Sequence, residues 1–139
     1  MIGILSKLFG GNKSEKDVKK IAPQVEKINQ FFAQYQQISN DELRSKTIEF
    51  KARIKEYLTD IDTEIENRKE AAEALPVEDI NGRDTIYKEV DELKKDRNKK
   101  IEEVLLELLP EAFAVVKETS RRFKENAEIE STATDLDKE

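Results

Sequence analysis

The first part of the chain repeats apolar residues at alternating intervals of three and four. This spacing places them in one line, or seam, along one side of a helix. Such a seam is typical of a helix that packs against a partner helix. Ser14 and Asp17 have the spacing of a capping box and predict the start of this helix. Pro23 lies within the pattern and predicts either a kink or a fresh helix start nearby. The seam consists of Val18, Ile21, Val25, Ile28, Phe32 and Tyr35.

The same rhythm continues in two longer stretches, which predict an antiparallel helical hairpin. Ser39 and Glu42 form another capping-box pattern, and the helix that follows should run to about Ala74. Proline and glycine mark residues 75–82 as a turn, and a third helix returns from about Asp84. Two amphipathic helices joined by a short turn pack antiparallel, so we expect an all-α fold of elongated helices with a coiled-coil-like hairpin. The seam positions are Leu43, Thr47, Phe50, Ile54, Tyr57, Ile61 and Ile65 in the first arm, and Ile86, Val90, Leu93, Arg97, Ile101, Val104 or Leu105, and Leu108 in the second.

The run from Val104 to Val116 is almost entirely apolar, with two charged residues in thirteen. We expect Pro110 to end the third helix and to open a fourth, which runs to Asn126. A helix that is apolar around most of its circumference must be covered on more than one side. Either something outside the chain or a second copy covers the run, or the four helices fold around it as a core. The polar residues 129–139 lack a seam, and we expect them to be poorly ordered.

The first nine residues form a separate amphipathic segment. At about 100° per residue, their apolar side chains cover an arc of about 160°, with Lys7 outside it. The apolar part is too short for a secretory signal peptide, and no small-residue cleavage site follows it. We predict that this segment contacts an anionic membrane surface or a membrane channel; the alternatives are packing on its own domain and disorder. The residues expected to make the contact are Ile2, Ile4, Leu5, Lys7, Leu8 and Phe9.

Composition favours long solvated helices and argues against catalysis. Charged residues make up 40% of the 139 residues and hydrophobic residues 37%, a mixture typical of coiled coils. The sequence has no histidine and no cysteine, so the usual general base, zinc ligands and thiol nucleophile are missing. We therefore predict that the chain has no catalytic, cofactor-binding or metal-binding residues. The net charge of −6 disfavours nucleic acid as a partner.

A basic cluster in the third helix invites a nucleic-acid or lipid interpretation. Acidic residues are interleaved with it at helical spacing, which indicates a solvated face with ion pairs along the helix. We adopt the solvated face as the prediction. The cluster consists of Lys94, Lys95, Arg97, Lys99 and Lys100.

Three stretches carry a family resemblance when they are taken together. The segment 4–10 is the amphipathic start, and the segment 38–53 begins ISNDELRSKT, similar to a pattern L-S-D-E-E-L-x-x-K-T. The segment 109–118 reads LPEAFAVVKE and resembles I-P-E-A-F-A-V-V-R-E almost position for position. In this order the stretches resemble the beginning of SecA, the motor ATPase of bacterial protein export. The segment between Ile54 and Leu108 is longer than usual for that family and looks like an insertion found in Bacteroidetes members.

The resemblance implies a role that the chain does not perform alone. The full protein would use ATP and magnesium to drive preproteins through the SecYEG channel, from the cytoplasmic face of the inner membrane. No phosphate-loop motif occurs in these residues, so no ATP-binding residue can be assigned here. The residues expected to dock on the motor domain are Leu109, Pro110, Phe113 and Val116.

We divide the chain into five segments on this basis. An alternative is a free-standing helical hairpin module with a membrane-touching N-terminus and no ATPase, and a homodimer is compatible with either interpretation. The segments are 1–12, amphipathic; 13–54, SecA-like N-terminal helices; 55–107, inserted hairpin arm; 108–126, helix docking on the nucleotide-binding domain; and 127–139, polar tail.

Overall fold

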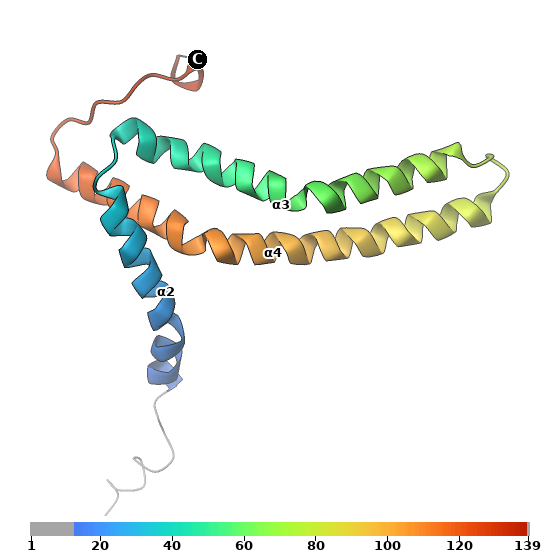
Figure 1. Cartoon of the computed structure of the whole chain (residues 1–139), viewed down its shortest axis with the longest axis horizontal. Helices are drawn as coiled ribbons and strands as arrows, with labels where there is room; N and C mark the ends of the chain where they lie inside the picture. Colours follow the sequence, from blue (N-terminus) through green and yellow to red (C-terminus); the bar gives the residue numbers. More distant parts are fainter. Residues whose placement is uncertain (1–12, 139) are drawn as a thin grey trace, which may run out of the picture. The chain divides into compact units, whose positions relative to one another are not determined.

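The computed structural model describes residues 13–138, and this part of the chain contains three long α-helices. The elements are α2 at Lys13–Tyr35, α3 at Asn40–Ala74, α4 at Ile80–Glu125 and a short 3-10 helix, η1, at Asp135–Asp137 (Figure 1). The described residues form no strand, so the all-α prediction is confirmed. The predicted amphipathic segment 1–9 lies outside the described residues. Within them, no helix combines the length and apolar character that a membrane crossing needs.

Side-chain caps determine where α3 and α4 begin. The Ser39 amide donates to Glu42 Oε2 at 2.7 Å, and the Glu42 amide donates to Ser39 Oγ at 3.2 Å, so the predicted capping box is present. Helix α4 begins earlier than predicted, at Ile80, because Asp79 Oδ1 accepts the amide of Gly82 at 2.9 Å. Gly82 allows this close approach, since a Cβ there would lie 2.8 Å from Asp79 Cγ.

Pro23 and Pro110 lie inside continuous helices. Helix α2 passes through Pro23, so the helix does not restart there. The prediction that Pro110 ends one helix and opens another was wrong, because α4 continues for 46 residues with Pro110 inside it. Proline removes one backbone hydrogen bond and crowds the preceding turn. Here burial on both sides of the proline, at Leu108 and Ala114, holds the helix together.

The chain divides into two compact units, and both boundaries fall within helices. The first unit comprises residues 1–43 and 110–139, and the second comprises residues 44–109. The first therefore contains α2, the first turn of α3 and the C-terminal part of α4. The second contains the rest of α3, the loop 75–79 and the N-terminal part of α4.

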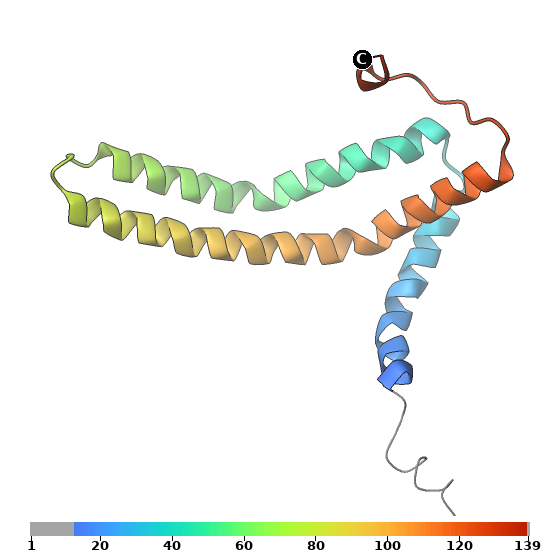
Figure 2. The same ribbon diagram turned by 180° about the vertical axis from the view of Figure 1, so that it is seen from behind.

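The second unit is an antiparallel hairpin with one apolar seam. Figures 1 and 2 show its two arms side by side along their length. Ion pairs flank the seam, including Arg68 to Glu89 at 3.1 Å and Arg53 to Glu107 at 3.7 Å. The seam is built from the buried residues Leu58, Ile61, Ile65 and Val90 and the partly buried Ile54, Leu93 and Ile101.

The predicted seam was correct in most places and wrong at Thr47 and Tyr57, which are both exposed. Ile61, Ile65 and Val90 are buried as expected. Tyr57 was placed in the seam but is 41% exposed, whereas its neighbour Leu58 is 3% exposed. A helix has 3.6 residues per turn, so a step of four from Ile54 reaches the core here where a step of three does not.

The first unit has its own core, where the end of α2 packs on α4. Lys117 Nζ donates to Asn29 Oδ1 at 2.7 Å and lies 4.3 Å from the centre of the Phe32 ring, which ties α4 to α2. The core contains the buried residues Tyr35, Leu43 and Ala114 and the partly buried Ile28, Phe31, Phe32, Ile38 and Val115.

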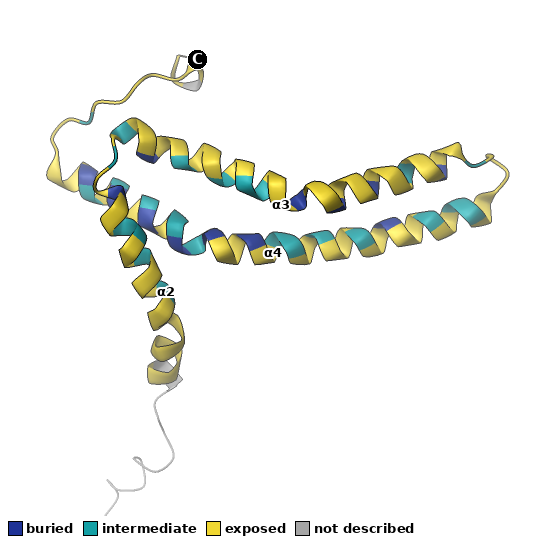
Figure 3. Cartoon of the chain, in the orientation of Figure 1, coloured by how far each residue is buried: buried dark blue, intermediate teal, exposed yellow. Residues whose placement is uncertain are grey.

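The first half of α2 does not take part in this core. Val18, Ile21 and Val25 were predicted to face a partner helix, yet they are 59%, 55% and 49% exposed. The prediction of a packed seam therefore holds only for the C-terminal part of α2, from Ile28 onward. Figure 3 shows this change from exposed to partly buried residues along the helix.

Candidate docking site

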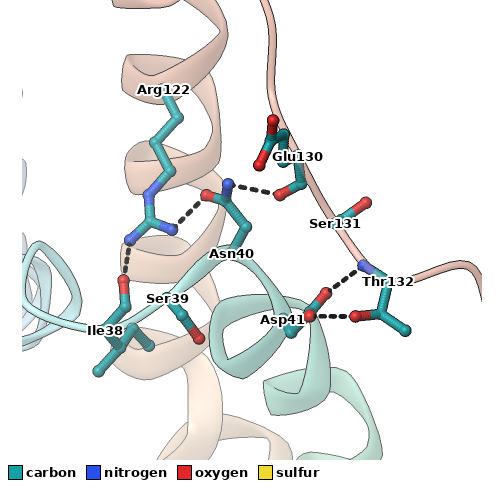
Figure 4. A pocket seen from close by; sticks show the side chains of 8 residues that line it. All are labelled: Ile38, Ser39, Asn40, Asp41, Arg122, Glu130, Ser131 and Thr132. Atoms are coloured by element: carbon teal, nitrogen blue, oxygen red, sulfur yellow. Dashed lines mark hydrogen bonds between the residues drawn. The ribbon is translucent and has the colours of Figure 1, made fainter.

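A buried arginine organises the first unit. Arg122 is 9% exposed and lies in the last turn of α4. Its guanidinium donates to the backbone oxygen of Tyr35, the last residue of α2, at 2.9 Å. It also donates to the backbone oxygen of Ile38 at 2.7 Å and to Asn40 Oδ1 at 2.6 Å (Figure 4). The last carbonyls of a helix lack partners within the helix and carry partial negative charge, so a cation is well placed there. Arg122 thereby caps α2 and holds the turn into α3.

The charge of Arg122 is balanced by a carboxylate that is buried completely. Glu118 is 0% exposed and accepts a hydrogen bond from Arg122 Nε at 2.7 Å. Arg121 donates to the same carboxylate through Nε at 2.8 Å and Nη2 at 2.7 Å. The hydrogen bonds from Arg121, and secondarily those from Arg122, lower the pKa of Glu118 against the opposing effect of burial. The same contact raises the pKa of Arg121, so the cluster stays ionised.

The segment after α4 returns to the start of α3. Asn40 Nδ2 donates to the Glu130 backbone oxygen at 2.7 Å, and Asp41 accepts the amide and hydroxyl of Thr132 at 2.8 and 2.6 Å (Figure 4). The expectation of a poorly ordered tail was therefore wrong at Glu130 and Thr132, because side chains at the first turn of α3 satisfy their backbone. A groove of about 590 Å³ lies along this return, lined by Ile38, Ser39, Asn40, Asp41, Arg122, Glu130, Ser131 and Thr132.

The hydrogen-bonding groups of Arg122 in this groove hold parts of the chain together. The guanidinium of Arg122 already donates to groups of its own chain, so its donors are committed to the fold. Among the described residues, no three acidic side chains converge in a way that would hold a metal ion. The groove is best described as a junction that joins α2, α3 and α4.

The opposite side of α4 presents an apolar face within the first unit. Phe113, Val116 and Phe123 are 56%, 64% and 69% exposed. At about 100° per residue they share an arc of about 80°, roughly opposite the buried Ala114, Glu118 and Arg122. We call this group of three exposed side chains the α4 face.

The residues predicted to dock on a motor domain fall into two groups. Phe113 and Val116 belong to the α4 face, whereas Leu109 is half-buried and Pro110 is buried. In the second unit, Leu105 and Leu106 are also 48% and 61% exposed. The alternative in which the chain folds around the whole apolar run as a core was therefore wrong for the described residues, which leave these four side chains 48–64% exposed.

The junction residues were missed from sequence, although a signal was present. Glu118 follows Ala114 by four positions, and Arg122 follows Glu118 by four, so both continue the buried line of α4. A charged pair on a buried line indicates a paired internal cluster. Its acceptors at Tyr35 and Ile38 come from far away in the chain, and no local pattern identifies them.

Three lysines of the basic cluster lie on a solvated face, as predicted, whereas Arg97 and Lys100 are half-buried. Lys94 pairs with Asp91 at 3.2 Å, Lys95 with Glu92 at 2.7 Å and Lys99 with Asp96 at 2.7 Å. All six side chains are more than half exposed. The Glu92 hydrogen bond raises the pKa of Lys95, and the Asp96 bond raises that of Lys99, so both remain cationic.

The helical fold and the α4 face together define a helical segment with an exposed apolar contact surface. Its residues 5–132 match the family model of the SecA DEAD-like domain, so the chain belongs to the SecA family. The confirmed resemblance is to the N-terminal region of that family, in its Bacteroidetes-like form.

The relatives match along the whole chain. It is 46% identical over 138 residues to a protein translocase subunit SecA of Flavobacterium psychrophilum. The identity is 42% over 137 residues for the SecA of Cytophaga hutchinsonii and 43% over 135 for that of Phocaeicola vulgatus. These matches cover 97–99% of the chain, so they include the hairpin. The chain spans 12% of the length of each relative. No solved structure matches the chain significantly.

Proposed function

We propose that this chain is the N-terminal segment of a SecA-like protein translocase subunit. The full protein would bind ATP and magnesium outside this segment and couple hydrolysis to the export of preproteins through the SecYEG channel. It would act as a peripheral protein on the cytoplasmic face of the inner membrane. The segment itself would contact the membrane or channel and support the motor domain. Support comes from relatives that are named translocase subunits and that are much longer than the chain.

The observation that carries the supporting role is the α4 face. Phe113, Val116 and Phe123 lie on the solvent side of a helix whose other side is packed. Burying a large apolar side chain is worth about 1.5–3 kcal/mol, so such a face favours a partner surface. The occupant we assign is the motor domain of the same polypeptide, because the relatives extend far beyond the length matched here. Leu109 would extend the contact, whereas the buried Pro110 would act only through the helix.

Reading the coding sequence beyond Glu139 tests the proposal directly. A G-x-x-x-x-G-K-[ST] phosphate loop within roughly the next hundred codons is expected for a motor ATPase. A stop codon immediately after Glu139 would contradict the proposal and favour a free-standing helical module.

Aspartate on the α4 face should destabilise the intact parent protein and leave the stability of the isolated 139-residue chain almost unchanged. In the 139-residue chain, Phe113→Asp with Val116→Asp should change the free energy of unfolding by less than about 0.5 kcal/mol, since both side chains are exposed. In the parent, the same pair should cost at least about 2 kcal/mol because the face is covered. Urea unfolding of both proteins measures the difference. Val77→Asp, at a residue 73% exposed in the loop, is the control. Equal effects of the double variant on segment and parent would refute motor docking.

Removing the apolar side chains of the first nine residues should abolish lipid binding. Vesicles containing anionic lipid should bind the chain, and Leu5→Asp, Leu8→Asp and Phe9→Asp together should weaken binding at least about tenfold. Vesicle co-sedimentation measures this. The matched control places aspartate at Leu106, Val116 and Phe123, which are also apolar and are 61–69% exposed. If both triple variants lose binding equally, contact through the first nine residues is wrong.

A further inference from the structure

A line of exposed residues on α3 changes its charge halfway along the helix. Every member is exposed, and the line lies entirely within the second unit. At about 100° per residue the line occupies an arc of about 100°, centred about 100° away from the buried seam. Figure 3 shows the exposed surface that runs along α3. This α3 stripe consists of Arg44, Ile48, Lys51, Lys55, Thr59, Asp62, Glu66, Glu70 and Glu73.

The order of charges along the stripe is self-complementary. All charged members before Thr59 are basic, and all those after it are acidic. Lys55 and Lys51 lie four and eight positions before Thr59, while Asp62 and Glu66 lie three and seven positions after it. Arg44 and Glu73 stand in the same relation, fifteen positions before and fourteen after. A second α3 laid antiparallel about Thr59 would therefore place each cation opposite a carboxylate, to within one residue.

We propose that the α3 stripe is a docking surface for a second copy of this chain. The two helices run antiparallel across a two-fold axis at Thr59. Lys55 then faces Asp62 of the second copy, and Lys51 faces its Glu66. A two-fold interface uses the same patch on both partners, so each pair occurs twice. Ile48 lies opposite the Glu70 side chain, whose methylene groups can cover it.

Four charged groups of the stripe are available for such a contact. Among the described residues, Lys51 and Lys55 have no carboxylate partner, and the carboxylates of Glu70 and Glu73 have no cationic partner. Glu66 pairs with Lys69 at 3.1 Å, and Asp62 pairs with Arg97, both at exposed positions. Both oxygens of Asp62 accept hydrogen bonds from Arg97, but each carboxylate oxygen has a second lone pair, so these pairs are compatible with the interface.

A second copy fits the stripe better than a partner of one charge. A wholly basic surface would repel the first half of the stripe, and a wholly acidic one would repel the second. The antiparallel copy provides both signs in the required order over a helix length of about 44 Å. The contact consists mainly of exposed ion pairs, each of which contributes little, so the association is weak and sensitive to salt.

Charge reversal on the two halves of the stripe tests the proposal by rescue. One variant carries Lys51→Glu with Lys55→Glu, and the other carries Asp62→Lys with Glu66→Lys. Each alone places like charges opposite one another and should raise the dimer dissociation constant at least about tenfold. An equimolar mixture of the two restores opposite charges at these positions and should dimerise again, to within about threefold of the original chain. Sedimentation equilibrium of the 139-residue chain at about 50 mM and about 500 mM salt provides the measurement.

A matched control separates position from net charge. Asp60→Lys with Glu64→Lys makes the same charge change on the same helix, also four residues apart, but on a different side. This control should dimerise like the original chain, and far-UV circular dichroism should show that every variant keeps its helix content. The proposal is overturned if the original chain stays monomeric at low salt and about millimolar concentration. It is overturned equally if the mixture fails to dimerise, or if the control is weakened as much as the stripe variants. None of these results bears on the proposed place in a translocase.

Discussion

Replacing Arg122 by alanine should lower the free energy of unfolding of the first unit by about 3–5 kcal/mol. The substitution removes hydrogen bonds to the Tyr35 and Ile38 carbonyls and to Asn40 Oδ1. It also leaves the completely buried Glu118 with one cationic partner in place of two. Removing one partner of a buried, hydrogen-bonded pair is costly because the remaining charge has lost its compensation.

Hydrogen exchange of the α4 amides around Ala114 measures this change within the first unit, and urea unfolding followed by circular dichroism provides the global value. Arg121→Ala is the control. The Arg121 side chain also binds Glu118 but is 34% exposed, so water can replace part of the lost hydrogen bonding. We therefore expect Arg121→Ala to lower the free energy of unfolding by less than Arg122→Ala does. A loss under about 1 kcal/mol for Arg122→Ala would show that the junction is not what holds the end of α2.

The start of α3 and the helix class were predictable because their causes are local. Ser39 and Glu42 lie three residues apart and satisfy each other's backbone whatever the rest of the chain does. The end of α3 at Ala74 was also predicted, since Pro76 follows closely and disfavours the helical conformation at Leu75. Alternating steps of three and four identified most of the hairpin seam for the same reason.

Features that depend on distant residues were predicted poorly. Pro110 has the local signature of a helix start, yet burial of α4 on either side of it outweighs the lost hydrogen bond. The seam of Val18, Ile21 and Val25 is a sound helical pattern, but a pattern does not guarantee that a partner is present. The Arg122 junction joins atoms more than eighty positions apart in the sequence, beyond the reach of any local rule.

The exposed apolar residues of α4 illustrate what sequence can establish about a site. The scarcity of charge between Val104 and Val116 predicted that the chain would not cover the run, and four of its large side chains are indeed exposed. Sequence did not predict which of the proposed docking residues would be available. Phe113 and Val116 are exposed, but Pro110 is buried, because the side of a helix that faces its own core depends on how the other helices pack.

Replacing Leu58 by alanine should cost about 3 kcal/mol in the free energy of unfolding of the hairpin. Leu58 is 3% exposed and packs in the cluster of Ile61, Ile65 and Val90, where a smaller side chain leaves a cavity between two helices. The neighbouring change Tyr57→Ala should cost about 1 kcal/mol or less, since Tyr57 is 41% exposed and contributes one hydrogen bond, from its hydroxyl to Glu103 at 3.0 Å.

The comparison between these neighbours decides which of two adjacent positions belongs to the seam. Urea unfolding followed by circular dichroism measures the free energy of unfolding of both variants. The dependence of this free energy on urea concentration shows whether the two unfolding transitions are comparable. The strict three-four pattern places Tyr57 in the core, whereas the packing of α3 on α4 places Leu58 there. A larger loss for Tyr57→Ala than for Leu58→Ala would mean that α3 is rotated by about 100° in the hairpin, and the seam would then lie about 160° from the α3 stripe instead of about 100°.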